Sequence, residues 1–507
     1  MKGGSILNAK RRIAPAVMAA FTALSALAAG CTLEPAYRRP QAPIVPQWPE
    51  AGRDAASTPV NAAASAAAEI GWREFFNDPR LQRLIELALQ HNPDARTAAL
   101  NIAAARAQYQ IQRADLFPSI AASGVEVDER YPASVAGIAT GVTSSGATTA
   151  IDTGGSTFRY FDAGIGFTSY ELDLFGRLRS LDRERQQQYF GYVETRRSTQ
   201  ICLVAEVANA YLTLLADQEL LDITGSTLGS QQNSYDLTKL SYSSGVATLL
   251  DLRQAESSVD SARANLARYT RQVAQDQNAL VLLLGTPLPG DLPPGGSLEQ
   301  QHLLADLSEG LPSDLLIRRP DVLAAEHNLI AANASIGAAR AAFFPSITLT
   351  GNYGTASTQL AGLFGHGSSA WTFSPQISLP IFAAGANVAA LDLAKVEKNV
   401  YVVQYESAIQ TAFREVADAL AGRSTLDSQI AADQSLVEAT SESYRLSEMR
   451  FRTGVDSYLS VLDSQRALYS AQQDLVGVRL ARLQNLVTLY KALGGGWNEH
   501  DRPHGGQ

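Results

Sequence analysis

Leu459, Asp463 and Arg466 bring an apolar, an acidic and a basic side chain together at helical spacing. Leu459 and Asp463 are four residues apart and Arg466 follows three later, so all three can share one helix face. Carboxylates that lie close to one another raise each other's pKa and attract cations. The plain alternative is a solvated Asp463–Arg466 ion pair, which would contribute little to stability.

No catalytic constellation accompanies these residues. The sequence contains no His-Glu-x-x-His, Gly-x-Ser-x-Gly or P-loop pattern, and its six histidines are scattered. Its two cysteines are too few for a disulfide framework or a cysteine-based metal cluster. The net charge of −9 makes nucleic acid a poor partner. We therefore expect no enzymatic activity, no cofactor and no bound metal.

The N-terminal segment predicts export and a lipid anchor. A basic stretch that ends at Arg12 precedes a short apolar run, 13–27, and the small residues before Cys31. This is a secretory signal, too short for a membrane span. A cysteine directly after Ala-Gly is similar to a lipoprotein signal, so we expect Cys31 to be acylated. The next residue is Thr32 rather than Asp, which by resemblance to bacterial lipoproteins points to the outer membrane. The alternative is an ordinary signal cleaved elsewhere, which would leave a free thiol.

The elements that would position these residues follow from an internal duplication. Residues 101–120 align without gaps on 328–347, and 234–266 align on 443–475. The first half carries an insertion within 121–169. A repeat of this length indicates two copies of one structural unit.

Each half is predicted to contain a helix, a β-hairpin and two long helices joined by a turn. Spacings of four and three between apolar residues, typical of coiled coils, recur in the long helices. The turns at Gly245-Val246 and Gly454-Val455 suit glycine, which accepts positive φ. The predicted helices are 79–115, 321–342, 177–243, 246–284, 383–452 and 455–493, and the predicted strands are 120–131, 158–174, 347–353 and 371–382.

Four strands per chain predict an oligomer. An open sheet in lipid leaves backbone groups unpaired at a cost of several kcal/mol each, and small closed barrels need about eight strands. Three chains would supply twelve strands and close the sheet, and their long helices would continue the same tube. Aromatic residues suited to membrane interfaces are Tyr131, Tyr160, Phe161, Phe167, Tyr170, Tyr353, Trp371 and Phe373.

Several motifs resemble those of the outer membrane factors, or TolC-like channels, and within them the lipidated OprM-type branch. The resemblance spans the mature chain to about Trp497. The stretches that carry it are 31–40 (CTLEPAYRRP), 72–76 (WREFF), 92–94 (NPD), 171–177 (ELDLFGR), 318–321 (RRPD) and 492–497 (ALGGGW).

This resemblance implies a mixed α and β membrane protein. It would be a homotrimeric twelve-stranded transmembrane β-barrel that continues into a long periplasmic α-helical barrel with an equatorial α/β belt. The implied function is the outer-membrane exit duct of a tripartite RND-type efflux pump, reached through a periplasmic adaptor and an inner-membrane transporter. The expected segments are a signal peptide (1–30), a lipidated tether (31–70), a first repeat (71–290), a belt linker (291–318), a second repeat (319–497) and a disordered tail (498–507).

The resemblance also assigns a periplasmic gate. Leu459 would form an apolar constriction, Asp463 a ring of three carboxylates, and Arg466 the partner that ties the ring shut. Asp251 is similar to the first-half gate acid of TolC-type tips, whereas Asp456 stands where those proteins place a gate-locking arginine. The turns at Gly245, Val246, Gly454 and Val455 would contact the adaptor.

Two other classes of function remain open. One is the exit duct of a secretion or metal-efflux system, although the scarcity of methionine weighs slightly against silver or copper. The other is a coiled-coil structural surface lipoprotein, which would form no pore and no conductance in planar bilayers. The cargo itself cannot be read from this chain.

Overall fold

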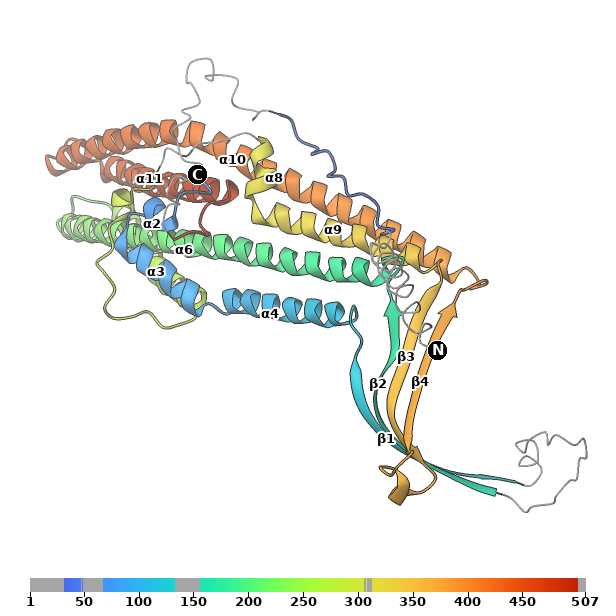
Figure 1. The fold of residues 1–507 in the computed structure, drawn as a ribbon. Coiled ribbons are helices and arrows are strands. Elements are labelled where there is room, and N and C mark those ends of the chain that lie inside the picture. Colours follow the sequence, from blue (N-terminus) through green and yellow to red (C-terminus); the bar gives the residue numbers. More distant parts are fainter. Residues whose placement is uncertain are drawn as a thin grey trace, which may run out of the picture. The chain divides into compact units, whose positions relative to one another are not determined.

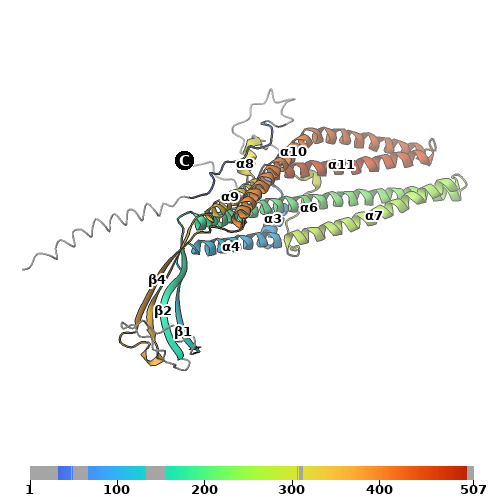
Figure 2. The same cartoon turned by 90° about the vertical axis from the view of Figure 1, so that its right-hand side faces the viewer.

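The computed structural model describes residues 32–46, 48, 67–132, 156–304, 307 and 312–499 (Figures 1 and 2). Cys31 and most of the first-half insertion lie outside these residues. The chain divides into two compact units, and each unit draws on both halves of the sequence. The first unit contains the residues up to Arg38 with Ala105–Tyr189 and Asn328–Tyr401, and the second contains Arg39–Ala104, Phe190–His327 and the residues from Val402 onward.

The order of elements repeats along the chain, as do several of their lengths. The long helices of the two halves each have 67 residues, and the helices that precede the strands each have 22. The first half contains α4 (Pro93–Ala114), β1 (Ile120–Tyr131), β2 (Ser156–Leu172), α6 (Arg177–Ser243) and α7 (Leu249–Leu284), and the second contains α9 (Pro320–Ala341), β3 (Ser346–Ser357), β4 (Ser369–Ser378), α10 (Ala386–Arg452) and α11 (Tyr458–Ala492).

The predicted boundaries hold best where the sequence supplies a strong start or stop signal. β1 and α6 have the predicted limits. β3 runs four residues further than predicted, to Ser357, because its pairing with β2 continues to Phe161. β4 ends at Ser378 rather than at 382, and Pro380, which has no N–H to donate, follows two residues later.

The four strands form one antiparallel sheet in the order β1-β2-β3-β4. Residues paired across two strands lie on the same face, so the registers of β3 with β4 sort their side chains. One face presents Ile347, Leu349, Tyr353, Trp371, Phe373 and Ile377, and the other presents Thr348, Thr350, Asn352, Thr372, Ser374, Gln376 and Ser378. The β3–β4 hairpin therefore has an apolar face and a polar face.

The aromatic side chains expected at a membrane interface divide between these faces. Tyr353, Trp371 and Phe373 lie on the apolar face and are exposed by 68%, 74% and 56%. Tyr160 lies on the polar face, as does Asp162, and its hydroxyl donates to the Asp162 carboxylate at 3.3 Å. Phe161 is buried. Part of the predicted aromatic set is thus packed or turned toward the polar face.

Glycine permits the change of direction between strand and helix in both halves. Gly176 (φ 76°) precedes α6, and Gly385 (φ 85°) precedes α10. Residues with a Cβ rarely adopt this left-handed conformation. The two equivalent junctions therefore contain a glycine in the same left-handed backbone conformation.

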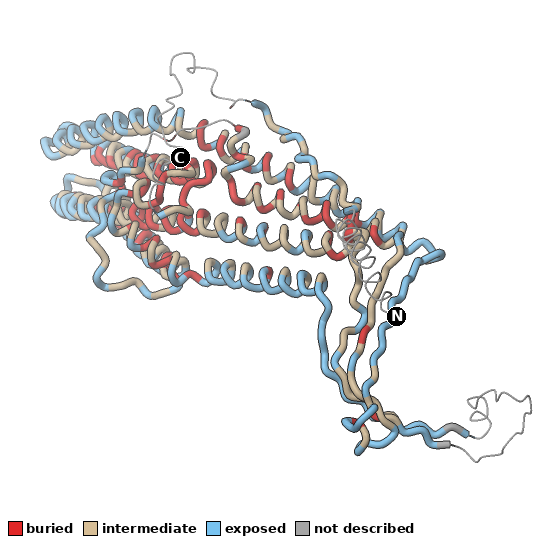
Figure 3. The backbone as a smooth tube through the Cα atoms, in the orientation of Figure 1, coloured by how far each residue is buried: buried red, intermediate tan, exposed pale blue. Residues whose placement is uncertain are grey.

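The second unit contains the larger core. Figure 3 shows buried residues concentrated in the helices, whereas the strands are mostly exposed or half-buried. The side chain of Phe75, in α2 (Trp72–Phe75), stacks on Tyr490 with ring centroids 4.0 Å apart. The Tyr490 hydroxyl donates to the Ile70 carbonyl at 2.7 Å. These contacts join the 72–76 motif to the end of α11.

Two other motifs are explained by capping and ion pairing within this unit. The Asn92 side chain accepts from the backbone N–H groups of Asp94 and Ala95 at 2.8 and 3.0 Å, so it ends α3 (Pro79–His91) and begins α4. The buried Arg319 guanidinium binds Asp321 and Glu415 at 2.6 and 2.8 Å. A buried arginine with two carboxylate partners avoids the cost of an unpaired charge.

The segments that surround this core are short. They are η1 (Leu298–Gln300), η2 (Pro312–Asp314) and α8 (Leu315–Arg318), and η3 (Leu360–Gly362) lies between the strands of the second hairpin in the other unit. Two residues of the predicted C-terminal tail make contacts. The Asn498 carbonyl accepts from the Trp72 N–H at 2.9 Å, and the Glu499 carboxylate pairs with the Arg73 guanidinium at 2.7 Å.

Candidate channel tips and gate

Two helical hairpins, α6 with α7 and α10 with α11, end in turns of the same geometry (Figure 2). Gly245 and Gly454 have φ values of 73° and 74°. The N–H of Val246 donates to the Ser241 carbonyl and that of Val455 donates to Arg450, both at 2.9 Å. A left-handed glycine with this bond back into the helix forms a Schellman cap.

The first turn carries a capping box. The Thr248 hydroxyl accepts from the Asp251 N–H at 3.2 Å, and the Asp251 carboxylate accepts from the Thr248 N–H at 2.9 Å. The hydrogen bond from the Thr248 hydroxyl, followed by that from its backbone N–H, lowers the pKa of Asp251. Asp251, predicted as a gate acid, is thus engaged as the third residue of α7.

The second turn carries an ion pair instead. The Arg450 guanidinium donates to both Asp456 oxygens, at 2.6 and 3.0 Å. This contact lowers the pKa of Asp456. In the first half, Ser241 and Ala247 occupy the equivalent positions, so the pair belongs to the second turn. Sequence reasoning identified Asp456 but missed Arg450 as its partner.

The predicted gate residues share the exposed face of α11. Leu459 is 49% exposed, and Asp463 and Arg466 are also exposed. The neighbouring face of α11 packs into a cluster that contains Tyr458, Val461 and Leu462 with Ala255 of α7. Within one chain the described contacts do not pair Asp463 with Arg466. The helix is therefore fixed by its buried face, while all three gate candidates are exposed outside this cluster.

Both tips expose apolar side chains, and the first tip exposes more. Val246 and Val455 are 82% and 63% exposed. Around the first turn, Leu240, Leu249 and Leu250 are also exposed by half or more. Exposed apolar residues gathered on one surface are typical of an interaction site.

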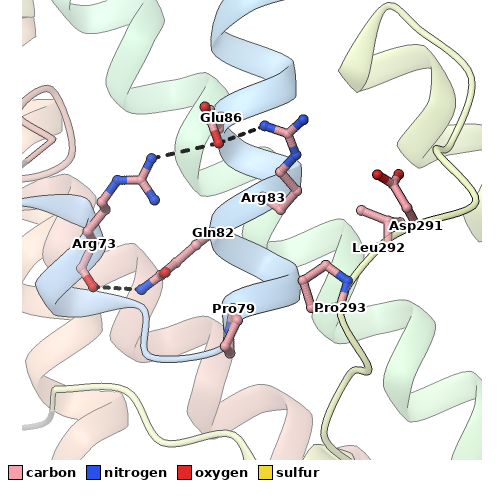
Figure 4. Close-up of a pocket in the computed structure, with 8 residues that line it drawn as sticks. All are labelled: Arg73, Pro79, Gln82, Arg83, Glu86, Asp291, Leu292 and Pro293. Atoms are coloured by element: carbon pink, nitrogen blue, oxygen red, sulfur yellow. Dashed lines mark hydrogen bonds and ion pairs between the residues drawn. The ribbon is translucent and has the colours of Figure 1, made fainter.

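A cavity of about 300 Å³ lies beside α3, away from the tips (Figure 4). Its two basic residues, Arg73 and Arg83, lie 3.8 and 2.9 Å from the Glu86 carboxylate. Gln82 donates to the Arg73 carbonyl at 3.0 Å. The cavity lies between α3 and the 291–293 segment, and Arg73, Arg83 and Gln82 already have partners there.

The capping box could have been found in the sequence. Thr248 and Asp251 have the Ser/Thr-x-x-Asp/Glu spacing that marks a helix start before an apolar run. That signal competes directly with the interpretation of Asp251 as a gate acid. In contrast, the Arg450–Asp456 pair spans a turn whose shape the spacing alone does not reveal.

An antiparallel sheet whose β3 and β4 strands expose an apolar face, in a chain with helices of 67 residues, is typical of an outer-membrane channel. The family model described as outer membrane efflux protein matches residues 84–286 and 311–495. The chain belongs to this family.

Similar proteins cover nearly the whole chain. It is 50% identical over 471 residues to the antibiotic efflux pump outer membrane protein ArpC and to the toluene efflux pump outer membrane protein TtgC, both of Pseudomonas putida, with 93% of each chain covered. The crystal structure of the open state of the Neisseria gonorrhoeae MtrE outer membrane channel matches with a TM-score of 0.82 at 38% identity. That match covers 93% of this chain and 100% of MtrE. The protein is an outer-membrane component of an efflux system.

Proposed function

We propose that three copies of this chain form a twelve-stranded barrel that spans the outer membrane. The observation that carries this proposal is the four-stranded sheet, in which β3 and β4 present an exposed apolar face and a polar face. Its outer strands, β1 and β4, leave backbone groups unpaired unless other copies add strands. With the apolar face outward, the polar face would line the pore.

The long helices of the three copies would continue this pore through the periplasm. An inner-membrane RND-type transporter would drive the cargo, and a periplasmic adaptor would contact the tips at Gly245-Val246 and Gly454-Val455. The names of the relatives favour toluene and antibiotics as cargo. The duct itself would be passive, since the family is one of channels. The repeated order of elements is what duplication of one ancestral unit would leave.

The gate would close at α11. Three copies of Leu459 would form an apolar constriction, three copies of Asp463 a carboxylate ring, and Arg466 of one chain would pair with Asp463 of the next. This proposal rests on the shared exposed face of these residues, which leaves them free for contacts between copies. Asp251 would contribute through the shape of the first tip, because its carboxylate is bound within the capping box.

The N-terminal cysteine would be the site of lipidation. Two or three acyl chains give stable membrane attachment, where a single chain is marginal. Replacing Cys31 would weaken this attachment, and the barrel could still insert through its own apolar face.

Disruption of the chain in its native host tests the efflux function. Susceptibility to antibiotics, dyes, solvents and metals should rise for organic compounds, with complementation by the intact gene. Sensitisation to metals alone would identify a metal-efflux duct. Unchanged susceptibility with a lost secreted protein would identify a secretion duct. The absence of conductance in planar bilayers would indicate a structural lipoprotein.

Assembly has a separate test. The protein extracted in mild detergent should have the mass of a homotrimer by native mass spectrometry. A stable, folded monomer would contradict the barrel.

A further inference from the structure

The N-terminal segment of the first unit is an extended strap bound along α9. The Arg340 guanidinium donates to the Leu33 carbonyl at 3.2 Å, and the Asn333 amide donates to the Pro35 carbonyl at 2.7 Å. In Figure 1 the blue trace runs beside the end of α9 from which β3 leaves. Two carbonyls of the strap, two residues apart, are each bound by a side chain of α9, and this fixes both the direction and the register of the strap.

The strap occupies a groove that depends on one glycine. The Glu34 side chain is only 8% exposed and lies 3.6 Å from Arg183 of α6. A Cβ at Gly337 would lie 3.0 Å from the Glu34 Cα and 2.6 Å from the Ser180 hydroxyl. The groove between α6 and α9 therefore exists because residue 337 has no side chain.

The equivalent helix of the first half cannot hold such a strap. In the gapless alignment of α4 with α9, Gln110 stands at the position of Gly337 and Arg106 at that of Asn333. The side chain of Gln110 would fill a groove at this position. The longer side chain of Arg106 cannot place a donor where the short Asn333 amide binds the Pro35 carbonyl. The duplicated helices thus differ at the positions that bind the strap.

A cavity of about 340 Å³ lies at the strand-to-helix junctions of the same unit. It is lined by residues 171–175 and Arg177 from the first half, by residues around Phe344 from the second, and by Ser378 and Pro380. The Asp173 side chain is 10% exposed; its Oδ2 accepts from Arg179, but its buried Oδ1 has no partner. A buried carboxylate oxygen without a donor is costly.

The strap points toward this cavity. Gly337 of the groove and Ala341 of the cavity are four residues apart on α9, and Ser180 and Arg177 are three apart on α6. Residues at these spacings share a helix face, so the groove continues into the cavity. Arg340 already holds Leu33, and residue 31 is two peptides, at most about 7.6 Å, further along the chain.

We propose that the junction cavity is a binding site for the acylglycerol head of a lipid. Where that lipid is the thioether-linked diacylglyceryl group of Cys31, the strap delivers it to the cavity. This inference rests on the proposed lipidation. The ester carbonyls accept from the guanidinium of Arg177, which lines the cavity.

The surroundings suit the acyl chains as well. Leu379 and Ile381, which flank Pro380 of the cavity, are 52% and 94% exposed, and Phe344 is 41% exposed. These apolar side chains give the acyl chains a path away from the polar head. A free phospholipid carries the same acylglycerol chemistry and is the second possible source.

Photo-cross-linking tests the site in the full-length protein in cells. Cells fed a diazirine-bearing fatty acid are irradiated, and labelled peptides are mapped by mass spectrometry. Wild-type protein should carry label on peptides that contain 171–177, 341–346 and 379–381. Gly337→Gln, which gives the groove the side chain of α4, should lose most of this label, and Asn333→Leu should lose it in part. The matched change Gln110→Ala on α4 should leave it unchanged.

The source of the lipid is separated by exporting a Cys31→Ser variant with an ordinary signal peptide. Loss of junction label assigns the site to the covalent lipid, and retention assigns it to free phospholipid. No junction label in the wild type, or equal label in the Gly337→Gln, Asn333→Leu and wild-type proteins, would overturn the proposal. The mass of the N-terminal peptide from the same sample reports lipidation itself, and drug susceptibility reports efflux, so these failures are distinguishable.

Discussion

The Asp78 carboxylate accepts a hydrogen bond from the Tyr211 hydroxyl at 3.0 Å. The same oxygen accepts from the Gln301 amide at 2.6 Å, and the other oxygen caps α3 through the N–H of Arg80 at 2.7 Å. One carboxylate therefore joins α3, α6 and the 298–304 segment. Burial raises the pKa of Tyr211, and the negative charge of Asp78 adds to this shift.

Removal of the Tyr211 hydroxyl should destabilise the second unit. Tyr211→Phe leaves a carboxylate with one donor fewer in a buried site, which costs about 1 to 3 kcal/mol. The matched control is Tyr405→Phe, because the buried Tyr405 hydroxyl has no hydrogen-bond partner and its removal should be neutral or stabilising. Thermal unfolding in detergent measures both. Equal melting temperatures for the two variants would show that the Asp78 network does not contribute.

The capping box at the first tip should matter more than the equivalent cap at the second. Thr248→Ala removes a side-chain cap and should cost about 1 kcal/mol locally. Ser457 makes no side-chain cap hydrogen bond, so Ser457→Ala is the control. Hydrogen exchange should quicken at the start of α7 only in Thr248→Ala. Similar exchange in both variants would argue against the cap.

Acid should loosen this cap. The folded pKa of Asp251 is lowered from its ordinary value of 3.8, so its contribution is present above that value and is lost as pH falls through the folded pKa. Asp251 is partly exposed to solvent, so the effect is small. The amide protons of Thr248 and Asp251 should be equally protected at pH 7 and at about pH 5 and should lose protection below the ordinary pKa. In Asp251→Asn this pH dependence should disappear; a loss that persists there would have another origin.

Opening of the proposed gate should be visible in conductance. Leu459→Ala combined with Asp463→Ala removes the apolar constriction and the carboxylates, so single channels in planar bilayers should conduct more and prefer cations less. Cells that carry this double variant should become sensitive to large antibiotics normally excluded from the periplasm. Ser460→Ala is the control, since it is turned by about 100° around α11 from Leu459. Unchanged conductance and selectivity in the double variant would place the constriction elsewhere.

Charge at the tips should uncouple the duct from its adaptor without altering the isolated pore. Val246→Glu and Val455→Glu place carboxylates on the exposed turns, where burial against a partner would be penalised. Efflux in cells should fall, and conductance of the purified channel should stay normal. Val246→Thr with Val455→Thr, which keeps the shape without a charge, should retain more activity. Full efflux in the glutamate variants would remove these turns from the contact.

The sequence predicted most of the fold because its strongest signals are local. Proline and glycine mark the ends of helices and strands. The gapless repeat means that an element predicted in one half is expected at the aligned residues of the other half. The limits of β3 depended on pairing with β2, which lies far away in the chain. The prediction that Leu459, Asp463 and Arg466 share one helix face needed only their spacing, because all three lie in the helix α11.

The contacts of the N-terminal segment could not be predicted in this way. Its many prolines and alanines are typical of a free tether, yet residues 33–35 are bound to α9. The cause is the missing side chain of Gly337 some 300 residues later, and no local pattern connects the two. The Asp78–Tyr211 contact was missed for the same reason, because its partners meet only after α3 and α6 have packed.

The chemical difference between the two tips has a consequence for attachment. The first tip is apolar around Val246, whereas the second is built around the exposed Arg450–Asp456 pair. Interactions between exposed charges weaken as ionic strength rises, whereas apolar contacts do not. A partner that binds both tips would therefore loosen at the second tip first when salt is raised, and would remain held at the first.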